Sequence, residues 1–392
     1  MTSPFLAAAR LWVAEDPDPE TRRALTAAID ANDDVELARG FASPLGFGTA
    51  GLRGPVGFGP ARMNLAVVLQ VSHALSLFLK EQGLDERPLL VGFDGRPESA
   101  GFARAAASVH AAAGLDVLLF DRPGPTPWVS FGARHLKAAA GVVLTPSHNP
   151  RGDAGYKLFD DVGIQIVSPW DTRIAELMRV GPPPNQIPRD EARVRSVPPE
   201  VLEAYDAWLA SLVTTVRNAA KIAVISSSEG ASTNAGSMKD GGSTRLARVG
   251  YTPLHGVGWA PTQAAARRFE IEWVAVPEQK EIDGTFPTTP SANPEEPGVL
   301  DALQRVLAAS SSDLGLAHDP DADRFALVAP RLGAGDTPRP LSGDALGLLF
   351  ADLWLEANAS VESPLLVSTV VSSPGLERLA RARDARVERT LT

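Results

Sequence analysis

Cysteine is missing from all 392 residues of this sequence. Its absence excludes disulfides, thiolate metal sites and a cysteine nucleophile, and it fits a protein of the cytosol. No apolar run approaches the roughly 18 residues that a membrane-spanning helix needs. Residues 1–16 also lack the basic start and long apolar core of a signal peptide. We therefore expect a cytoplasmic protein with no membrane partner.

An excess of basic side chains is also missing. The chain has 37 lysines and arginines against 47 aspartates and glutamates, a net charge of −10. Nucleic-acid binding needs a concentrated basic surface, so this balance argues against such a partner. A small phosphate ligand needs only a few local cations or a metal ion. The length favours two to three domains, and no sequence signal indicates an oligomeric state.

Short apolar runs alternate with helix-like stretches in the first half of the chain. We predict strands at 88–93, 115–120 and 139–144, with helices at 98–113 and 127–137. This alternation is typical of βαβ units and predicts an α/β fold with a mostly parallel sheet. In such sheets the functional loops follow the carboxyl ends of the strands. Residues 94–97 and 145–150 both lie in that position.

The rest of the chain contains further elements of the same kinds. Helical patterning covers 20–39, and a glycine-rich loop or bulged hairpin at 44–59 precedes a predicted helix at 64–81. The proline-rich segment 181–200 is interpreted as a linker, and 226–243 as a low-complexity surface loop. Further helices are predicted at 199–213, 342–357 and 375–383, and further strands at 221–225, 248–251, 272–276, 313–317, 365–370 and 386–391.

The strongest chemical motif is Asp319-Pro320-Asp321-Ala322-Asp323. Three carboxylates at alternate positions repel one another unless a cation or solvent screens them. Their hard oxygen ligands suit Mg²⁺ or Ca²⁺. An EF-hand would need glycine and glutamate where Arg324 and Pro330 stand, so that interpretation fails. A solvated acidic turn is the alternative to a metal site.

A second motif places a serine between two prolines, in Thr145-Pro146-Ser147-His148-Asn149-Pro150. The prolines stiffen the loop, and a serine on a rigid loop after a strand suits nucleophilic or phosphoryl chemistry. A plain connecting turn explains the same residues. His148 could be a base, but neighbouring side chains on an extended chain point apart, so no catalytic triad is expected.

Three basic residues are further candidates for the site. They are Arg53 in the glycine-rich loop, Lys157 in Gly155-Tyr156-Lys157, and Arg324 beside the aspartates. Any one of them alone would usually be a surface charge. The glycines around Arg53 would let backbone N–H groups approach an anion, although the segment lacks the Gly-Lys-Ser/Thr end of a Walker A motif.

Taken together and in this order, the motifs resemble those of the α-D-phosphohexomutase superfamily. Within it, Arg62-Met63-Asn64 and Val276-Pro277-Glu278-Gln279 resemble the phosphoglucomutase/phosphopentomutase-type branch, to which enzymes labelled phosphomannomutase also belong. The resemblance spans about residues 46–392. The segments that carry it are 48–54, 145–150, 155–157, 251–258, 283–288, 293–297 and 319–324.

This resemblance implies a Mg²⁺-dependent phosphosugar mutase. Ser147 would carry the transferable phosphate, and Asp319, Asp321 and Asp323, with a phosphate oxygen on Ser147, would hold Mg²⁺. Arg53, His148, Lys157 and Arg324 would surround the reacting atoms, with Lys157 favoured over His148 as general acid or base. The substrates would be sugar phosphates, with a sugar 1,6-bisphosphate as activator and hexose phosphates preferred over pentose phosphates.

The resemblance also implies related α/β domains around a cleft. We expect one at 1–200 with the serine loop, a second at 201–328 with the metal loop, and an incomplete third at 329–392. The family's sugar-selecting loop and fourth domain would follow Thr392, so we expect weak or no turnover from this chain. A sugar 1,6-bisphosphate synthase and a non-catalytic phosphosugar-binding protein are the alternatives to the mutase.

Overall fold

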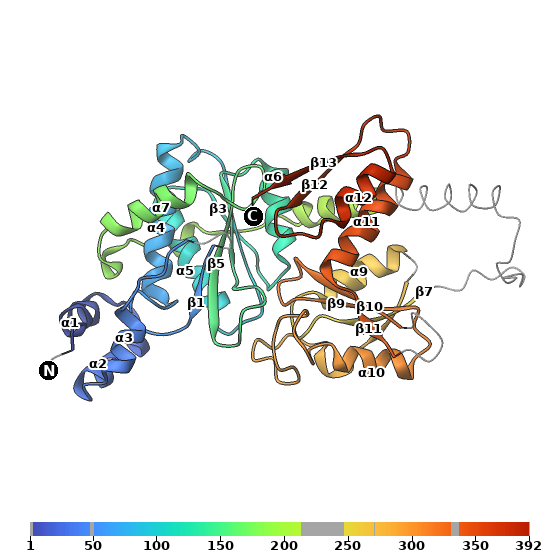
Figure 1. The fold of residues 1–392 in the computed structure, drawn as a ribbon. Coiled ribbons are helices and arrows are strands. Elements are labelled where there is room, and N and C mark those ends of the chain that lie inside the picture. The colour runs from blue at the N-terminus through green and yellow to red at the C-terminus, as the bar shows by residue number, and fades with distance from the viewer. Residues whose placement is uncertain (1–2, 48–50, 213–246, 270, 331–336, 392) are drawn as a thin grey trace, which may run out of the picture.

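The computed structural model describes residues 3–47, 51–212, 247–269, 271–330 and 337–391, with the elements labelled in Figure 1. The predicted strand at 221–225 and surface loop at 226–243 lie outside these residues. In the part of the chain that is described, no helix is long and apolar enough to cross a membrane.

The first half of the chain builds a six-stranded sheet with the order β1-β5-β4-β2-β3-β6. Neighbours β4-β2, β2-β3 and β3-β6 run parallel, whereas β5 runs antiparallel to both β4 and β1. The strands are β1 (Leu52–Pro55), β2 (Leu89–Phe93), β3 (Val117–Leu119), β4 (Ala140–Leu144), β5 (Asp153–Phe159) and β6 (Arg195–Ser196).

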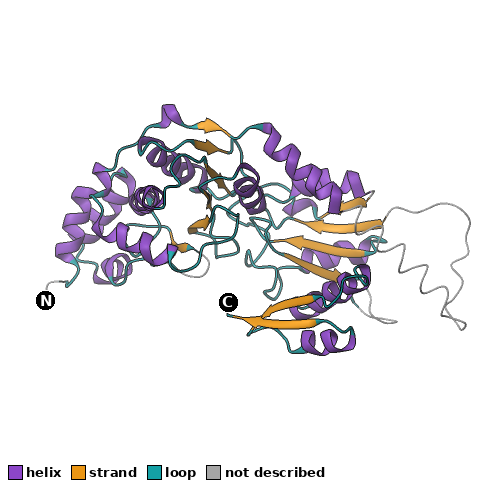
Figure 2. Cartoon of the chain, turned by 90° about the horizontal axis from the view of Figure 1, so that it is seen from above, coloured by secondary structure: helices purple, strands orange, loops and turns teal. Residues whose placement is uncertain are grey.

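Helices cover this sheet, as the apolar composition of its central strands requires. Every residue of β2 and β4 is buried, the pattern of a parallel sheet packed on both faces. Three N-terminal helices lie at the end of the molecule away from the second sheet (Figure 1 and Figure 2). The helices of this half are α1 (Leu6–Glu15), α2 (Pro19–Asp30), α3 (Asp34–Phe41), α4 (Leu65–Glu81), α5 (Ser99–Ala112), α6 (Thr126–Leu136) and α7 (Trp170–Val180).

The interpretation of 181–200 as a linker is wrong for part of that segment. Two short 3-10 turns, at Pro184–Gln186 and Glu191–Arg193, lead into β6, which pairs with β3 at the edge of the sheet. The side chain of Ile187 is buried in the core of this half. The prolines that suggested a linker shape a chain that is packed against the sheet. Residues 199–212, predicted as a helix, are helical.

The second half builds a five-stranded sheet with the order β11-β10-β9-β7-β8. Strands β7, β8 and β9 are parallel, and β10 runs antiparallel to β9. The elements are β7 (Ala247–Thr252), α9 (Trp259–Phe269), β8 (Ile271–Ala275), a 3-10 turn at Pro277–Gln279, α10 (Asp301–Ala309), β9 (Leu314–His318), β10 (Phe325–Ala329) and β11 (Arg339–Pro340).

The last elements form a separate two-stranded parallel sheet with two helices. The helices and strands predicted there are confirmed within one or two residues. Strand β11 pairs with β10, so residues 339–340 belong to the second sheet. The elements are α11 (Gly343–Ala357), β12 (Leu365–Thr369), α12 (Gly375–Ala382) and β13 (Arg386–Thr390).

The two large sheets share one connection that matters for the site. In each, a strand of the parallel set is followed directly by an antiparallel neighbour: β4 by β5 in the first sheet, and β9 by β10 in the second. The loop between β4 and β5 contains 145–152, and the loop between β9 and β10 contains 319–324. The serine motif and the aspartate motif therefore occupy equivalent positions in two sheets.

Candidate active site

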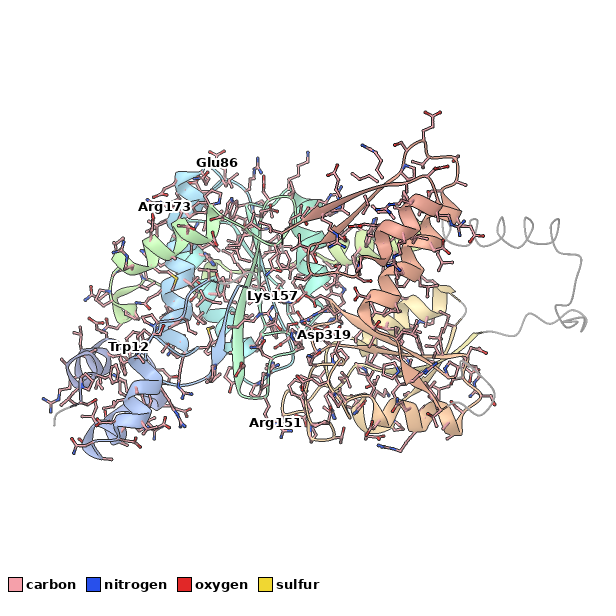
Figure 3. All side chains as sticks on the ribbon, in the orientation of Figure 1. Trp12, Glu86, Arg151, Lys157, Arg173 and Asp319 are labelled. Carbon is pink, nitrogen blue, oxygen red and sulfur yellow. The ribbon has the colours of Figure 1, made fainter. Side chains whose placement is uncertain are left out.

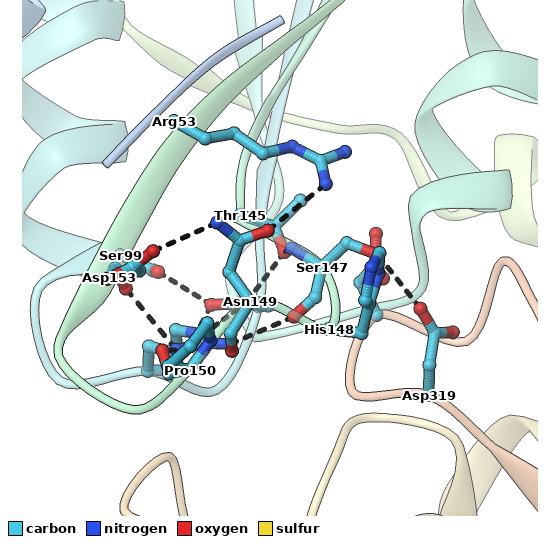
Figure 4. A network of polar contacts seen from close by, with 12 residues as sticks. Arg53, Ser99, Thr145, Ser147, His148, Asn149, Pro150, Asp153 and Asp319 are labelled. Atoms are coloured by element: carbon cyan, nitrogen blue, oxygen red, sulfur yellow. Dashed lines mark hydrogen bonds and ion pairs between the residues drawn. The ribbon is translucent and has the colours of Figure 1, made fainter. Parts of the chain in front are cut away.

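The two loops meet at Ser147, whose side chain is fully buried (Figure 4). Its Oγ donates a hydrogen bond to Asp319 Oδ2 at 2.9 Å and accepts one from Arg324 Nη2 at 2.9 Å. The predicted nucleophile and the predicted metal loop, 172 residues apart in sequence, are thus in direct contact. The serine hydroxyl lies between a carboxylate and a guanidinium.

His148 lies closer to Ser147 than the sequence predicted. Its Nδ1 is 3.2 Å from Ser147 Oγ, and Arg324 Nη2 is 3.4 Å from its Nε2. The prediction that the two side chains point apart assumed an extended chain, but Ser147 has a φ of 56°. This left-handed backbone turns the chain locally and brings neighbouring side chains together.

The remaining aspartates are held by Lys157 of β5. Its Nζ donates to Asp321 Oδ2 and to Asp323 Oδ2, each at 2.5 Å. Lys157 and Asp319 lie together between the two sheets (Figure 3). Arg53 of β1 reaches the same region, with its Nη1 3.5 Å from Asn149 Oδ1. The structure therefore brings all of the predicted site residues into one place.

Burial and charge shift the pKa values of Asp319 and Asp321 in opposite directions. Burial, and then the charges of Asp321 and Asp323, raise the pKa of Asp319 well above its ordinary value. Burial also opposes ionisation of Asp321, but the ammonium of Lys157 outweighs it and lowers the pKa of Asp321. Burial similarly disfavours the charged form of Lys157, yet Asp321 and Asp323 raise its pKa. The buried Lys157–Asp321 pair is therefore charged.

The aspartate cluster fits a divalent cation. Asp319, Asp321 and Asp323 each offer a carboxylate oxygen, and these atoms lie within 4.8 Å of one another. Asp321 Oδ1 is buried and has no hydrogen-bond partner. A buried carboxylate oxygen normally has one, and a metal ion would satisfy it. Hard oxygen donors of this kind suit Mg²⁺.

Further residues that the sequence reasoning did not assign to the site support both loops. Thr126, at the start of α6, donates from Oγ1 to Asp321 Oδ2 at 2.5 Å and from its backbone N–H to the Asp321 carbonyl at 2.9 Å. Arg96 and Asp94, from the loop after β2, hold the serine loop. The sequence placed both residues at the carboxyl end of a strand, where functional loops lie, but it did not indicate what either residue does.

Comparison with known proteins agrees with this geometry. The model of Phosphoglucomutase/phosphomannomutase, alpha/beta/alpha domain I, matches residues 44–181, and that of domain II matches 234–333. Mus musculus phosphopentomutase is 32% identical over 408 residues, covering 97% of this chain and 61% of that protein. Glucose 1,6-bisphosphate synthase of Pongo abelii is 30% identical, covering 97% of this chain and 61% of that protein.

A solved structure of a protein from Thermus thermophilus superimposes with a TM-score of 0.70 at 24% identity, covering 89% of this chain and 70% of that one. The fold is therefore a multi-domain α/β fold of the phosphosugar-mutase class. The chain belongs to the phosphoglucomutase/phosphomannomutase family, which confirms the predicted superfamily. It spans 61% of the length of the two curated relatives named above.

Proposed function

We propose that this chain carries the phosphoryl-transfer site of a phosphosugar mutase, with Ser147 as the residue that holds the phosphate. The observation that carries the proposal is the contact of the buried Ser147 Oγ with both Asp319 and Arg324, each at 2.9 Å. Arg324 can balance negative charge on a group bound to Ser147 Oγ, and a cation held by the aspartates would offset their repulsion of a phosphate.

In the proposed reaction, the bond between Ser147 Oγ and phosphorus breaks while a free hydroxyl of a sugar monophosphate bonds to phosphorus, and the proton of that hydroxyl ends on Ser147 Oγ. The resulting bisphosphate returns its other phosphate to Ser147. The substrate class is therefore a sugar monophosphate with its phosphate at position 1, or at position 5 or 6. Related proteins are named for pentose phosphates and for glucose 1,6-bisphosphate, so both sugar sizes belong in the test.

The residues around Ser147 have distinct proposed roles. Arg324 donates to Oγ and would neutralise charge on the leaving oxygen. His148 Nδ1, 3.2 Å from Oγ, is better placed than Lys157 to exchange a proton there. Lys157, charged and held by Asp321 and Asp323, would balance the charge of the cluster. Mg²⁺ held by the three aspartates would neutralise phosphate oxygens during transfer.

Phosphorus NMR tests the proposal. Protein is incubated with glucose 1-phosphate or ribose 1-phosphate, Mg²⁺ and a trace of the matching bisphosphate. Ser147→Ala is compared with the exposed-serine control Ser168→Ala. We expect weak conversion to the 6- or 5-phosphate by wild type and Ser168→Ala, in line with the low turnover expected of this chain, and none by Ser147→Ala. Conversion by Ser147→Ala would show that another group carries the phosphate.

The second candidate, a bisphosphate synthase, is favoured by one observation, the 30% identity with glucose 1,6-bisphosphate synthase. An assay that supplies 1,3-bisphosphoglycerate together with the sugar monophosphate distinguishes the synthase from the mutase. Accumulation of sugar bisphosphate, without conversion of 1-phosphate to 6-phosphate in the first assay, would favour the synthase. Binding of sugar phosphate with neither product would favour a non-catalytic protein.

A further inference from the structure

The serine loop, residues 145–152, is held by a buried arginine from the loop that follows β2. Arg96 follows β2 and is 4% exposed. Its Nη1 donates to the carbonyls of Pro150 at 2.7 Å and Asp153 at 3.3 Å. Its Nη2 donates to the carbonyls of Ser147 at 2.9 Å and Asn149 at 2.6 Å. One guanidinium therefore fixes three backbone positions of the loop and the first residue of β5.

Asp94, two residues earlier, completes this support. It accepts from the backbone N–H of Arg96 at 3.0 Å, and its Oδ2 is 3.6 Å from Arg96 Nε. The same Oδ2 accepts from Thr145 Oγ1 at 2.7 Å, and Thr145 Oγ1 accepts from the backbone N–H of Ser147 at 2.9 Å. Hydrogen bonds thus reach Ser147 from both its backbone N–H and its carbonyl.

This support explains how Ser147 keeps an unusual backbone conformation. A φ of 56° is uncommon for a residue with a Cβ, and it persists only where the surroundings determine it. The guanidinium is suited to the task because it is planar and presents its donors in a fixed fork. A lysine would offer a single ammonium at one point, so it could not reach all four carbonyls.

The same arginine is covered by a residue from the other half of the chain. The ring of Phe286 lies over the guanidinium, with Arg96 Cζ 4.9 Å from the ring centroid. Phe286 is 2% exposed. The neighbouring backbones are in close contact, because a Cβ on Gly284 would come within 2.5 Å of Arg96 Cα. Arg96 therefore links the serine loop to the half of the chain that supplies the aspartates.

We infer that Arg96 is a positioning residue for phosphoryl transfer: it touches the backbone of the serine loop and sets where Ser147 Oγ lies against Asp319. This inference rests on the proposed function of Ser147. Arg96 contacts backbone carbonyls, Asp94 and Phe286, and not an atom that would react. Its loss should therefore slow the transfer step and leave the KM for the phosphate donor unchanged. Misplacing a reacting atom by about 1 Å can cost about 10²-fold in rate.

The test measures transfer of phosphate from glucose 1,6-bisphosphate to Ser147, by intact-mass spectrometry over time in the presence of Mg²⁺. Arg96→Lys is compared with Arg104→Lys, an exposed arginine on α5 that serves as the matched control. Hydrogen–deuterium exchange of the peptide covering 145–153 reports the order of the loop independently. Phe286→Leu is the second variant, and it keeps every hydrogen bond of Arg96.

We expect Arg96→Lys to be phosphorylated about 10²-fold more slowly at unchanged KM, with faster exchange at 145–153. Phe286→Leu should lose about tenfold, as expected for removing a buried cation–π contact. Arg104→Lys should behave as wild type. Should Arg96→Lys not fold, Phe286→Leu decides: faster exchange at 145–153 with a rate within twofold of wild type shows that the order of the loop does not set the rate, and overturns the inference.

The inference and the proposed function fail in different ways. A wild-type protein that takes up no phosphate on Ser147 refutes the proposed function, and the inference falls with it. A wild type that is phosphorylated on Ser147, beside a folded Arg96→Lys with a rate within threefold of it, overturns the inference alone. Faster hydrogen–deuterium exchange at 145–153 in Arg96→Lys, with an unchanged rate of phosphorylation, would also overturn the inference alone.

Discussion

Replacing Lys157 by methionine tests the charge balance of the site most directly. The Lys157 side chain is 2% exposed and that of Asp321 is fully buried, with 2.5 Å between Nζ and Oδ2. Methionine removes the ammonium and leaves Asp321 the hydrogen bond from Thr126 but no cationic partner in direct contact among the described residues. Removing one partner of a buried ion pair costs about 3–5 kcal/mol, so we expect a loss of that size in the free energy of unfolding.

The assay is urea unfolding at pH 7.5, in EDTA and in Mg²⁺, with the exposed Lys80→Met as control. A surface substitution of that kind should change stability by less than about 0.5 kcal/mol. Mg²⁺ should stabilise Lys157→Met more than wild type, because no ammonium then competes for Asp321 and Asp323. Saturation at about 100 times Kd would contribute about 2.7 kcal/mol. A loss below about 1 kcal/mol in EDTA, or equal gains from Mg²⁺, would refute the reasoning.

Two further predictions concern stability and loop packing. Burial lowers the pKa of His110 to about 3, against about 6.5 in an unfolded chain. Its contribution is complete above pH 6.5 and is lost as pH falls, about 2 kcal/mol between pH 7 and 5. Unfolding at several pH values should show this slope and His110→Gln should flatten it; an unchanged slope would contradict the assignment. A Cβ on Gly155 would lie 2.4 Å from the Thr145 carbonyl oxygen, so Gly155→Ala should cost about 1–3 kcal/mol and slow phosphorylation of Ser147. Gly101→Ala, where a Cβ on α5 meets nothing within 4 Å, should instead stabilise by about 0.5–1 kcal/mol, and the same sign for both would show that the close approach is absent.

The sequence predicted the elements whose pattern is strong. The buried strands β2 and β4 are apolar along their whole length, and α4 and α11 have a clear helical period, so all four were found. Strand β5 was missed because it contains Asp153 and Lys157, whose charges interrupt the apolar run that marks a strand. Helices α1 and α7 were missed as well. The division into domains at 200 and 328 stays a prediction.

The candidate site was predicted from its motifs, but its contacts were not. Sequence indicated which residue types belong to phosphoryl chemistry. The structure brings together Ser147 and the three aspartates from loops that follow strands β4 and β9, whereas Arg53 and Lys157 lie within strands β1 and β5. The role of Arg96 depends on four backbone carbonyl groups. Every residue has such a group, so the sequence does not indicate which carbonyls accept hydrogen bonds from Arg96. The contact between Ser147 and His148 depends on the positive φ of Ser147, and a serine in the sequence does not predict a positive φ.

The hydroxyl of Ser147 and the carboxylate of Asp319 come from equivalent loops of two separate sheets, and the hydrogen bond between them spans 172 residues. The serine loop is held mainly by Arg96 and Asp94 of its own half, whereas the aspartate loop also takes hydrogen bonds from Thr126 and Lys157 of the other half. The distance between the two loops depends wholly on how the two sheets dock. During refolding the site should therefore appear after the secondary structure does, because contacts of high sequence separation form late. During denaturation it should disappear first, and metal affinity would then report the docking of the two halves while both still hold their helices.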